Sequence, residues 1–353
     1  ESVPPKMYGG TERIVSYLTE ELVRQGHDVT LFASGDSQTS AKLVSGSKEA
    51  LRLGNCIDPL APHVTMLQEV LERYHEFDVI HYHIDYLHFP VSKLIRNPQL
   101  TTLHGRLNIP ELSPLYEKFG EMPVVSISND QRLPLPLANW TETVYHGLPL
   151  DLYELGKGDG DYVAFIGRVS PEKRLDRAIA IAKKAGIKLK IAAKIDKADQ
   201  EYYEKEIQPL MNDPLVEYVG EIGEKEKVDF LGKAKALLFP IDWSEPFGLV
   251  MIESMACGTP VLAWPCGSVN EVVDEEKTGF IVSSIEEAVK ALEKIENIDR
   301  VACRKQFEKR FSVQRMAADY LNVYKKLIAS NKSGSLKSLL LKQVSDVSLY
   351  SKM

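Results

Sequence analysis

Cysteine is scarce in this chain: Cys56, Cys257, Cys266 and Cys303 are the only four among 353 residues. No two of them form a Cys-x-x-Cys pair, so their spacing does not indicate a zinc site or a redox motif. We expect four free thiols, which is the usual state in a reducing compartment, and therefore a cytoplasmic protein.

Long apolar runs and an excess of basic residues are also lacking. No stretch reaches the ~18 to 20 apolar residues that span a bilayer, and the first thirty residues contain no apolar signal core. The chain has 43 Lys and Arg against 50 Asp and Glu, a formal net charge of −7. A global basic field that would attract nucleic acid is thereby excluded, so we expect phosphate binding, if present, to be local.

The length favours two domains, because a domain usually comprises roughly 150 residues. Apolar residues at helical spacing over 11–25 are followed by an apolar run at 29–33, and this alternation of helix and strand then repeats. Further strands are expected at 78–83, 100–104 and 123–128, with a helix at 63–74. Such alternation predicts an α/β fold with a doubly wound parallel sheet.

A glycine-rich stretch at 147–162 separates this series from a second one, so we place a domain boundary there. The second series has expected strands at 162–167, 188–193, 216–220, 236–240, 260–264 and 279–282, and helices at 171–185, 202–211, 225–234, 247–257, 284–295 and 311–329. We assign 1–153 and 154–310 to two Rossmann-like domains, whose strand ends should face a common cleft. The Ser- and Lys-rich tail at 331–353 is left unassigned.

Residues 243–260 (WSEPFGLVMIESMACGTP) contain Glu245 and Glu253, which are separated by seven residues. At ~1.5 Å of helical rise per residue their spacing is about 12 Å. That distance resembles the separation between the sugar and the ribose of a nucleotide-sugar, so one carboxylate could meet each end. The backbone N–H groups near Gly248, Leu249 and Val250 would then face a diphosphate at the helix N-terminus. Taken alone, the motif also fits an amphipathic helix with two solvated glutamates.

Residues 166–174 (IGRVSPEKR) place Arg168 at the end of a strand. Ser170 is expected as the N-cap of a helix and Pro171 as its first residue. Arg168 and Lys173 could therefore converge on the same diphosphate and stabilise a leaving group without a metal ion. Two cations at a helix start also occur simply as surface charges.

Two features of the first domain complete the candidate site. Gly9 and Gly10 stand immediately before a helix, where a backbone without side chains can approach an anion, although such a pair can also be a plain tight turn. His104 ends a strand and is expected to face the cleft. The other histidines (His81, His83, His88 and His146) are individually more typical of structural or surface positions, and no carboxylate completes a metal-ligand spacing around the HYH segment.

Together, Glu245-x7-Glu253, IGRVSPEKR, YGGTER and the continuation PVLAW...GSVNEVV...TGFIV resemble glycosyltransferase family 4, over nearly the whole chain to residue 329. The resemblance implies a GT-B architecture in which the final helix, 311–330, crosses back to complete the first, acceptor-side domain. It also implies a core strand before the glycine loop, so we expect a native segment to precede Glu1. Its further implications are a nucleotide-sugar donor for the second domain and retention at the anomeric carbon.

The resemblance also suggests roles for individual residues. It implies a diphosphate-binding pair (Arg168, Lys173), a ribose acceptor (Glu253), a carboxylate at the donor sugar (Glu245), a backbone cradle (Phe247, Gly248, Leu249, Val250), loop glycines near the phosphates (Gly9, Gly10) and a histidine near the reacting sugar (His104). Where the family usually has Asn-Gly-Val-Asp at the domain hinge, this chain has His146 in place of the asparagine.

The sequence therefore predicts a retaining glycosyltransferase without metal or cofactor, which transfers a sugar from a nucleoside diphosphate to a hydroxyl acceptor such as a sugar, a lipid or a small molecule. A nucleotide-sugar epimerase or phosphorylase of the same fold is an alternative, although the sequence shows neither its acid/base pair nor a pyridoxal lysine. A non-catalytic nucleotide-sugar binding protein is another. The donor, the acceptor, the linkage and the oligomeric state are not specified by these patterns.

Overall fold

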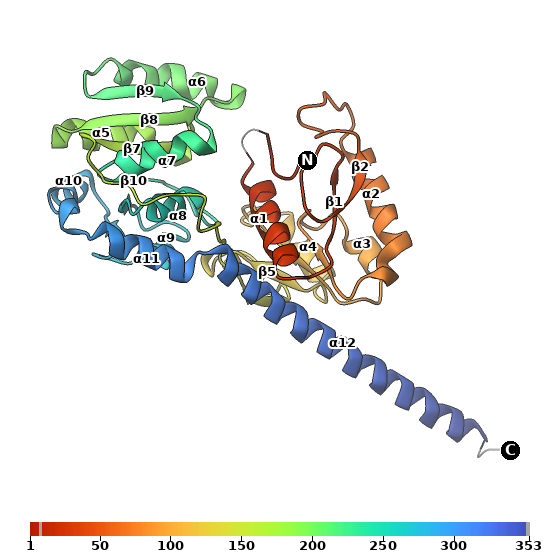
Figure 1. Ribbon diagram of the computed structural model, residues 1–353. Coiled ribbons are helices and arrows are strands. Elements are labelled where there is room, and N and C mark those ends of the chain that lie inside the picture. Colours follow the sequence, from red (N-terminus) through yellow and green to blue (C-terminus); the bar gives the residue numbers. More distant parts are fainter. Residues whose placement is uncertain (7–8, 351–353) are drawn as a thin grey trace.

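The computed structural model describes residues 1–6 and 9–350, with side chains described as far as residue 331. Two domains built on parallel sheets lie next to each other (Figure 1). In the first domain the strands form two separate sheets, β1 with β2 and β3-β4-β5-β6. These strands are β1 (Thr30–Ser34), β2 (Lys42–Ser47), β3 (Ile80–Tyr82), β4 (Gln99–Thr102), β5 (Val124–Ser126) and β6 (Trp140–Thr143), and the helices are α1 (Gly10–Arg24), α2 (Leu60–Arg73), α3 (Phe89–Ser92) and α4 (Leu112–Lys118).

A cavity of about 890 Å³ lies between the two sheets of the first domain. Residues of β1, such as Leu31 and Phe32, and of β3, such as Ile80 and Tyr82, line it together with Tyr324 of the C-terminal helix. β1 and β3 are therefore separated by a space instead of pairing with each other.

The second domain has one six-stranded parallel sheet in the order β12-β11-β10-β7-β8-β9. Its strands are β7 (Tyr162–Arg168), β8 (Lys188–Lys194), β9 (Val216–Gly220), β10 (Leu237–Phe239), β11 (Val261–Ala263) and β12 (Gly279–Ile281). Its helices are α5 (Leu175–Ala185), α6 (Gln200–Tyr202), α7 (Glu224–Lys233), α8 (Leu249–Ala256), α9 (Val269–Val272), α10 (Ile285–Glu293) and α11 (Arg300–Arg310). Read from β9, the order is 3-2-1-4-5-6, so the prediction of a doubly wound sheet is confirmed.

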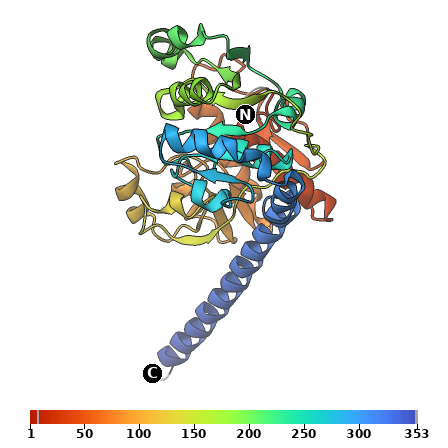
Figure 2. The same cartoon turned by 90° about the vertical axis from the view of Figure 1, so that its left-hand side faces the viewer.

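The chain crosses between the domains at two adjacent points. Leu148 donates its N–H to the carbonyl of Phe311 and accepts from the N–H of Val313, both at 2.9 Å. From there α12 (Val313–Tyr350) packs against α1 of the first domain and then extends away from both domains (Figures 1 and 2). Its buried Tyr320 and Tyr324 reach the strands of the first domain through Thr102 and His81. None of the described helices is long and apolar enough to cross a bilayer.

Several local expectations were wrong. The helix expected at 171–185 is interrupted, because Pro171–Lys173 form a 3-10 turn, Arg174 is left-handed and α5 begins only at Leu175. Ser170 therefore does not cap an α-helix, and its hydroxyl has no hydrogen-bond partner among the described residues. The segment at 202–211 is irregular, with a π turn and then a 3-10 turn that contains Pro209, which lacks a backbone donor.

Elements were missed as well: the sequence patterns did not reveal β2, β6, α3, α4 or α11. The backbone of the unassigned tail continues α12 as far as Tyr350, and residues 351–353 lie outside the described residues. All four cysteines are free thiols, as expected.

His88, at the start of α3, is a buried histidine whose hydrogen-bond partners are neutral hydroxyl groups. Its ring stacks on Tyr82 with centroids 3.6 Å apart, Nδ1 lies 2.5 Å from the Ser92 hydroxyl and Nε2 lies 2.6 Å from the Thr101 hydroxyl. Burial lowers the pKa of His88 to about 3, whereas an unfolded histidine has a pKa of roughly 6.5. The folded protein therefore binds one proton fewer at this site between these two pH values.

This difference predicts that His88 destabilises the fold as the pH falls below 6.5, by about 2 kcal/mol between pH 7 and pH 5. Urea unfolding across this range should show a smaller loss of stability in His88→Gln than in the wild type, whatever the absolute stability of the variant. The exposed Val64 provides the control, since Val64→Ala changes no titratable group and should keep the wild-type pH dependence. A wild-type pH dependence in His88→Gln would contradict the assignment.

Candidate active site

The candidate site lies where the strand order of the second sheet reverses. β7 pairs with β8 on one side and with β10 on the other, although β10 follows β9 in the chain. In open α/β sheets, ligands bind outside the carboxyl ends of the strands at such a switch point. β7 ends at Arg168 and is followed by the turn that carries Lys173, while β10 is followed by the loop that carries Glu245. The topology thus explains why these segments meet.

Lys173 and Glu245 contact each other directly. The Lys173 ammonium forms an ion pair with Glu245 Oε2, and both side chains are largely buried. The indole Nε1 of Trp243 donates to the same carboxylate oxygen at 3.1 Å, and the Lys173 ammonium lies 5.1 Å from the Trp243 ring. Two predicted site residues are therefore brought together. Trp243 was missed, although it stands only two residues before Glu245.

Arg168 lies at the same edge of the sheet but has other partners. Its guanidinium donates to Glu172 at 3.0 Å and lies 3.8 Å from Asp196. Within the described part of the chain it makes no ion pair or hydrogen bond with Glu245. Arg168 therefore does not join the pair of Lys173 and Glu245, and about a third of its side chain (35%) is exposed. Its convergence with Lys173 on one diphosphate stays a prediction.

The N-terminus of α8 offers free backbone donors next to Glu245. Gly248 precedes the helix with φ of 77°, a left-handed conformation in which a Cβ would lie 2.8 Å from Met251 Cε. Among the described residues, the N–H groups of Gly248, Leu249 and Val250 have no hydrogen-bond partner, as is expected of the first turn of a helix. Ser268 donates to the carbonyl of Phe247 at 2.6 Å and so holds the start of this segment.

The helix begins after Glu245, which contradicts the spacing derived from helical rise. α8 starts at Leu249, so Glu245 lies in the preceding loop while Glu253 lies inside the helix. The estimate of about 12 Å for continuous helix therefore does not apply between these carboxylates. Their environments also differ, because Glu245 faces Lys173 whereas Glu253 faces another lysine.

That second lysine is Lys227 of α7, whose ammonium lies 2.9 Å from each carboxylate oxygen of the buried Glu253. One turn earlier, Glu224 accepts a hydrogen bond of 2.6 Å from Tyr17 of α1 and lies 3.5 Å from Arg13. Burial and the neighbouring Glu224 raise the pKa of Tyr17. Glu253, the predicted ribose-binding carboxylate, thus lies next to a contact between the two domains. The position of Lys227 in the sequence did not indicate that it pairs with Glu253.

The glycine loop of the first domain meets α8. Gly9 caps α1 and Gly10 begins it. A Cβ on Gly10 would lie 3.3 Å from Leu249 Cδ1, so the N-termini of α1 and α8 approach closely at this point. Met7 and Tyr8 of the same loop lie outside the described residues.

His104 links the first domain to the second through stacked rings. Its Nε2 lies 2.8 Å from His83 Nδ1, and its ring stacks on His146 at 5.3 Å. His146 in turn makes an edge contact with Phe247 at 4.8 Å. Burial lowers the pKa of His104 to about 4 and the pKa values of His83 and His146 well below the usual value, so these rings are neutral near pH 7.

The HYH segment is not arranged as a metal site. His81 uses Nδ1 on the Tyr324 hydroxyl and Nε2 on the Thr102 hydroxyl, each at 2.8 Å. Across the described residues, no three His, Cys, Asp or Glu side chains are grouped so as to hold a metal ion.

A second contact between the domains involves Glu271 of α9. Its carboxylate accepts hydrogen bonds from the backbone N–H groups of Asn129 (2.7 Å) and Asp130 (2.8 Å), from the Asn129 side chain (2.8 Å) and from the Tyr145 hydroxyl (2.9 Å). Ser244, in the loop that carries Glu245, donates to Asp130. The segment GSVNEVV contains Glu271, but only the tertiary structure shows what this carboxylate does.

Comparison with known proteins gives two family matches. Residues 154–311 match the family described as glycosyl transferases group 1, and residues 8–129 match glycosyltransferase family 4. An uncharacterized glycosyltransferase of Methanocaldococcus jannaschii is 25% identical over 272 residues, which are 71% of this chain and 76% of that protein. The D-inositol 3-phosphate glycosyltransferase of Mycolicibacterium smegmatis is 30% identical over 164 residues, which are 40% of this chain and 36% of that protein.

Solved structures share the fold. AviGT4, a glycosyltransferase involved in avilamycin A biosynthesis, superposes with a TM-score of 0.71 at 23% identity and covers 93% of each chain. Anabaena HepE, solved in complex with UDP and glucose, gives a TM-score of 0.69 at 18% identity over 90% of this chain and 96% of that one. The two domains therefore have the GT-B architecture, and the chain belongs to the group 1 glycosyltransferases of glycosyltransferase family 4.

Proposed function

We propose that the protein is a retaining, metal-independent glycosyltransferase that moves a sugar from a nucleoside-diphosphate sugar to a hydroxyl acceptor. The observation that carries the proposal is the position of the Lys173–Glu245 pair beside the free N–H groups of α8, at the switch point of the sheet. The fold it shares with HepE, which has been solved with UDP and with UDP-glucose, supports a nucleotide donor.

The free N–H groups of Leu249 and Val250 and the Lys173 ammonium form a cationic cradle for a diphosphate. An arriving diphosphate would take the Lys173 ammonium away from Glu245, which frees the Glu245 carboxylate to accept hydrogen bonds from the donor sugar. Positive groups fixed in this way stabilise the charge that develops on the leaving diphosphate during transfer.

The first domain supplies the groups that would contact the donor sugar and the acceptor hydroxyl. His104 is neutral near pH 7 because of its burial, so it can exchange a hydrogen bond with a hydroxyl of the sugar or the acceptor. The acceptor attacks the face from which the diphosphate departs, and a phosphate oxygen of the leaving group takes the acceptor proton. Gly10 and Leu249 approach closely where the two domains meet, and closer contact at this point with the donor bound would exclude water from the reaction.

Activity should survive treatment with EDTA, and the product should keep the anomeric configuration of the donor. Metal independence is expected because Lys173 and the α8 N-terminus provide the positive charge that a divalent ion would otherwise supply. Retention is expected because the acceptor attacks the face from which the diphosphate departs. Anomeric NMR of the product, recorded with and without EDTA over a panel of nucleotide-sugars, tests them. Loss of activity with EDTA that manganese restores would contradict metal independence, an inverted product would contradict retention, and release of free epimerised sugar would indicate the epimerase alternative.

The two glutamates should differ in their effects on binding and turnover. Glu253→Gln should weaken binding of the nucleoside diphosphate about tenfold, because a hydrogen bond to a charged group contributes ~1.5 to 3 kcal/mol. Glu245→Gln should instead lower kcat, since its carboxylate faces the donor sugar during transfer. Calorimetric titration of the diphosphate and steady-state kinetics measure the two effects, with melting temperatures as a folding control. The reverse pattern would mean that the donor lies in the opposite direction along α8.

A further inference from the structure

Arg174 adopts a backbone conformation that is unfavourable for its residue type. With φ of 53° and ψ of 50° it lies in the left-handed region, between the 3-10 turn that carries Lys173 and the first residue of α5. A residue with a Cβ is strained there, whereas glycine is not. Strain of this kind persists only where the surrounding contacts enforce it, and it is often found at functional sites.

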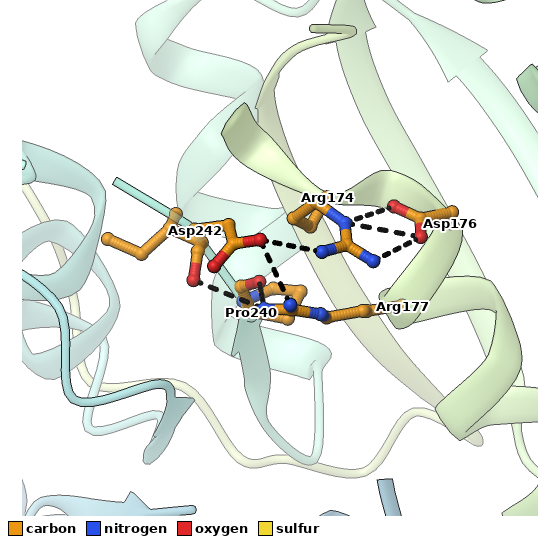
Figure 3. Close-up of polar contacts among 6 residues, drawn as sticks. Arg174, Asp176, Arg177, Pro240 and Asp242 are labelled. Carbon is orange, nitrogen blue, oxygen red and sulfur yellow. Dashed lines mark hydrogen bonds and ion pairs between the residues drawn. The ribbon is translucent and has the colours of Figure 1, made fainter. Parts of the chain in front are cut away.

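The Arg174 guanidinium lies between two carboxylates (Figure 3). Nε and Nη2 donate to the two oxygens of Asp176 at 2.9 and 2.8 Å, and Nη1 donates to Asp242 at 2.8 Å. The pKa of Arg174 is raised, chiefly by its hydrogen bonds to Asp176, so the guanidinium remains charged. Arg174 thereby joins the start of α5 to the loop after β10.

Asp242 is tied to the same helix a second time. Arg177 Nη2 donates to Asp242 at 3.1 Å, and Arg177 Nη1 donates to the carbonyl of Pro240 at 3.3 Å (Figure 3). The backbone N–H of Asp242 also donates to the carbonyl of Glu172 at 2.9 Å. We call Arg174, Asp176, Arg177 and Asp242 the α5 brace.

The α5 brace connects the two segments that carry the site. Arg174 directly follows Lys173, and Asp242 lies three residues before Glu245. Without ligand, the ion pair between Lys173 and Glu245 also holds these segments together. A diphosphate that binds Lys173 would break that pair, and the side chains of the brace would then still join the two segments, together with the backbone bond from Asp242 to Glu172.

We propose that Arg174 is a positioning residue, which through Asp242 keeps Lys173 and Glu245 in register while a diphosphate occupies the site. This inference rests on the proposed function. Arg174 acts through these two segments and does not contact the ligand, because its donors are directed to Asp176 and Asp242.

Calorimetric titration with UDP, GDP, ADP and dTDP tests the brace, using for the variants the diphosphate that the wild type binds most tightly. Arg174→Gly relieves the strain and removes the bridge, while Asp242→Ala removes the bridge from the other side. Each should weaken binding about tenfold, and the double variant should be no weaker than either single one, because coupled residues are not additive. Lys184→Ala is the matched control, since it removes an ion pair with Glu286 from the far end of α5 and should leave binding unchanged.

Arg174→Lys separates geometry from charge. It keeps the charge but loses the fork that spans two carboxylates, so it should bind the diphosphate little better than Arg174→Gly. A purely structural role would lower the melting temperature of Arg174→Gly and leave diphosphate affinity intact, which would overturn the proposal. Weak binding by Arg174→Gly together with wild-type binding by Asp242→Ala would also overturn it, because Arg174 would then contact the ligand directly.

A wild type that binds none of the four diphosphates would contradict the proposed function. In that case the effect of the brace on the loop is measured without ligand. In protein labelled with 5-fluorotryptophan, the ¹⁹F signal of Trp243 is assigned by its loss in Trp243→Phe. Trp243 lies next to Asp242, so its signal should shift in Arg174→Gly and in Asp242→Ala. The signal of Trp140, which packs against the core of the first domain, should not shift. An unchanged Trp243 signal in both variants would show that the brace does not hold the loop.

Discussion

The parallel pairing of β7 with β10 is the constraint on which the arrangement of the site depends. Ala164 of β7 lies opposite Leu237 of β10, so the carboxyl ends of these strands emerge next to each other although more than sixty residues separate them. The segments that follow carry Lys173 and Glu245. A change in this register would move one of these side chains away from the other, and the free N–H groups of α8 would lose their charged neighbours.

Charge compensation is the second principle of the site. Each candidate functional cation or carboxylate already has a partner: Lys173 pairs with Glu245, Lys227 with Glu253, and Arg168 with Glu172. Removing one member of a buried pair leaves an uncompensated charge, which is strongly destabilising. In the proposed function an anionic ligand replaces Glu245 beside Lys173, and hydrogen bonds from Trp243 and from the donor sugar then compensate the released carboxylate. The site is therefore charge-compensated without a ligand, which is compatible with the proposed binding of a diphosphate.

Contacts between the domains surround this site. Tyr17 reaches Glu224 on one side, Glu271 receives four hydrogen bonds from the first domain on another, and the stacked rings of His104 and His146 lead to Phe247 between them. The position of the first-domain groups relative to Lys173 and Glu245 therefore depends on these contacts. Group 1 glycosyltransferases share this two-domain architecture, and here its polar contacts are made by residues distributed over the whole chain.

The sequence by itself determined those helices and strands that follow from local patterns of apolar residues. Apolar periodicity alternating between helix and strand predicted parallel sheets, and the motifs around Lys173 and Glu245 placed both residues in one candidate site. Their direct ion pair was not predicted. Arg174 shows the limit of such reasoning, because its left-handed backbone and its hydrogen bond to Asp242, a partner far along the chain, are seen only in the structure. The roles of Lys227 and Glu271 were decided only by the tertiary structure for the same reason. The sequence determines the chemistry of each side chain. Its partner depends on how strands and helices that are far apart in the sequence pack together.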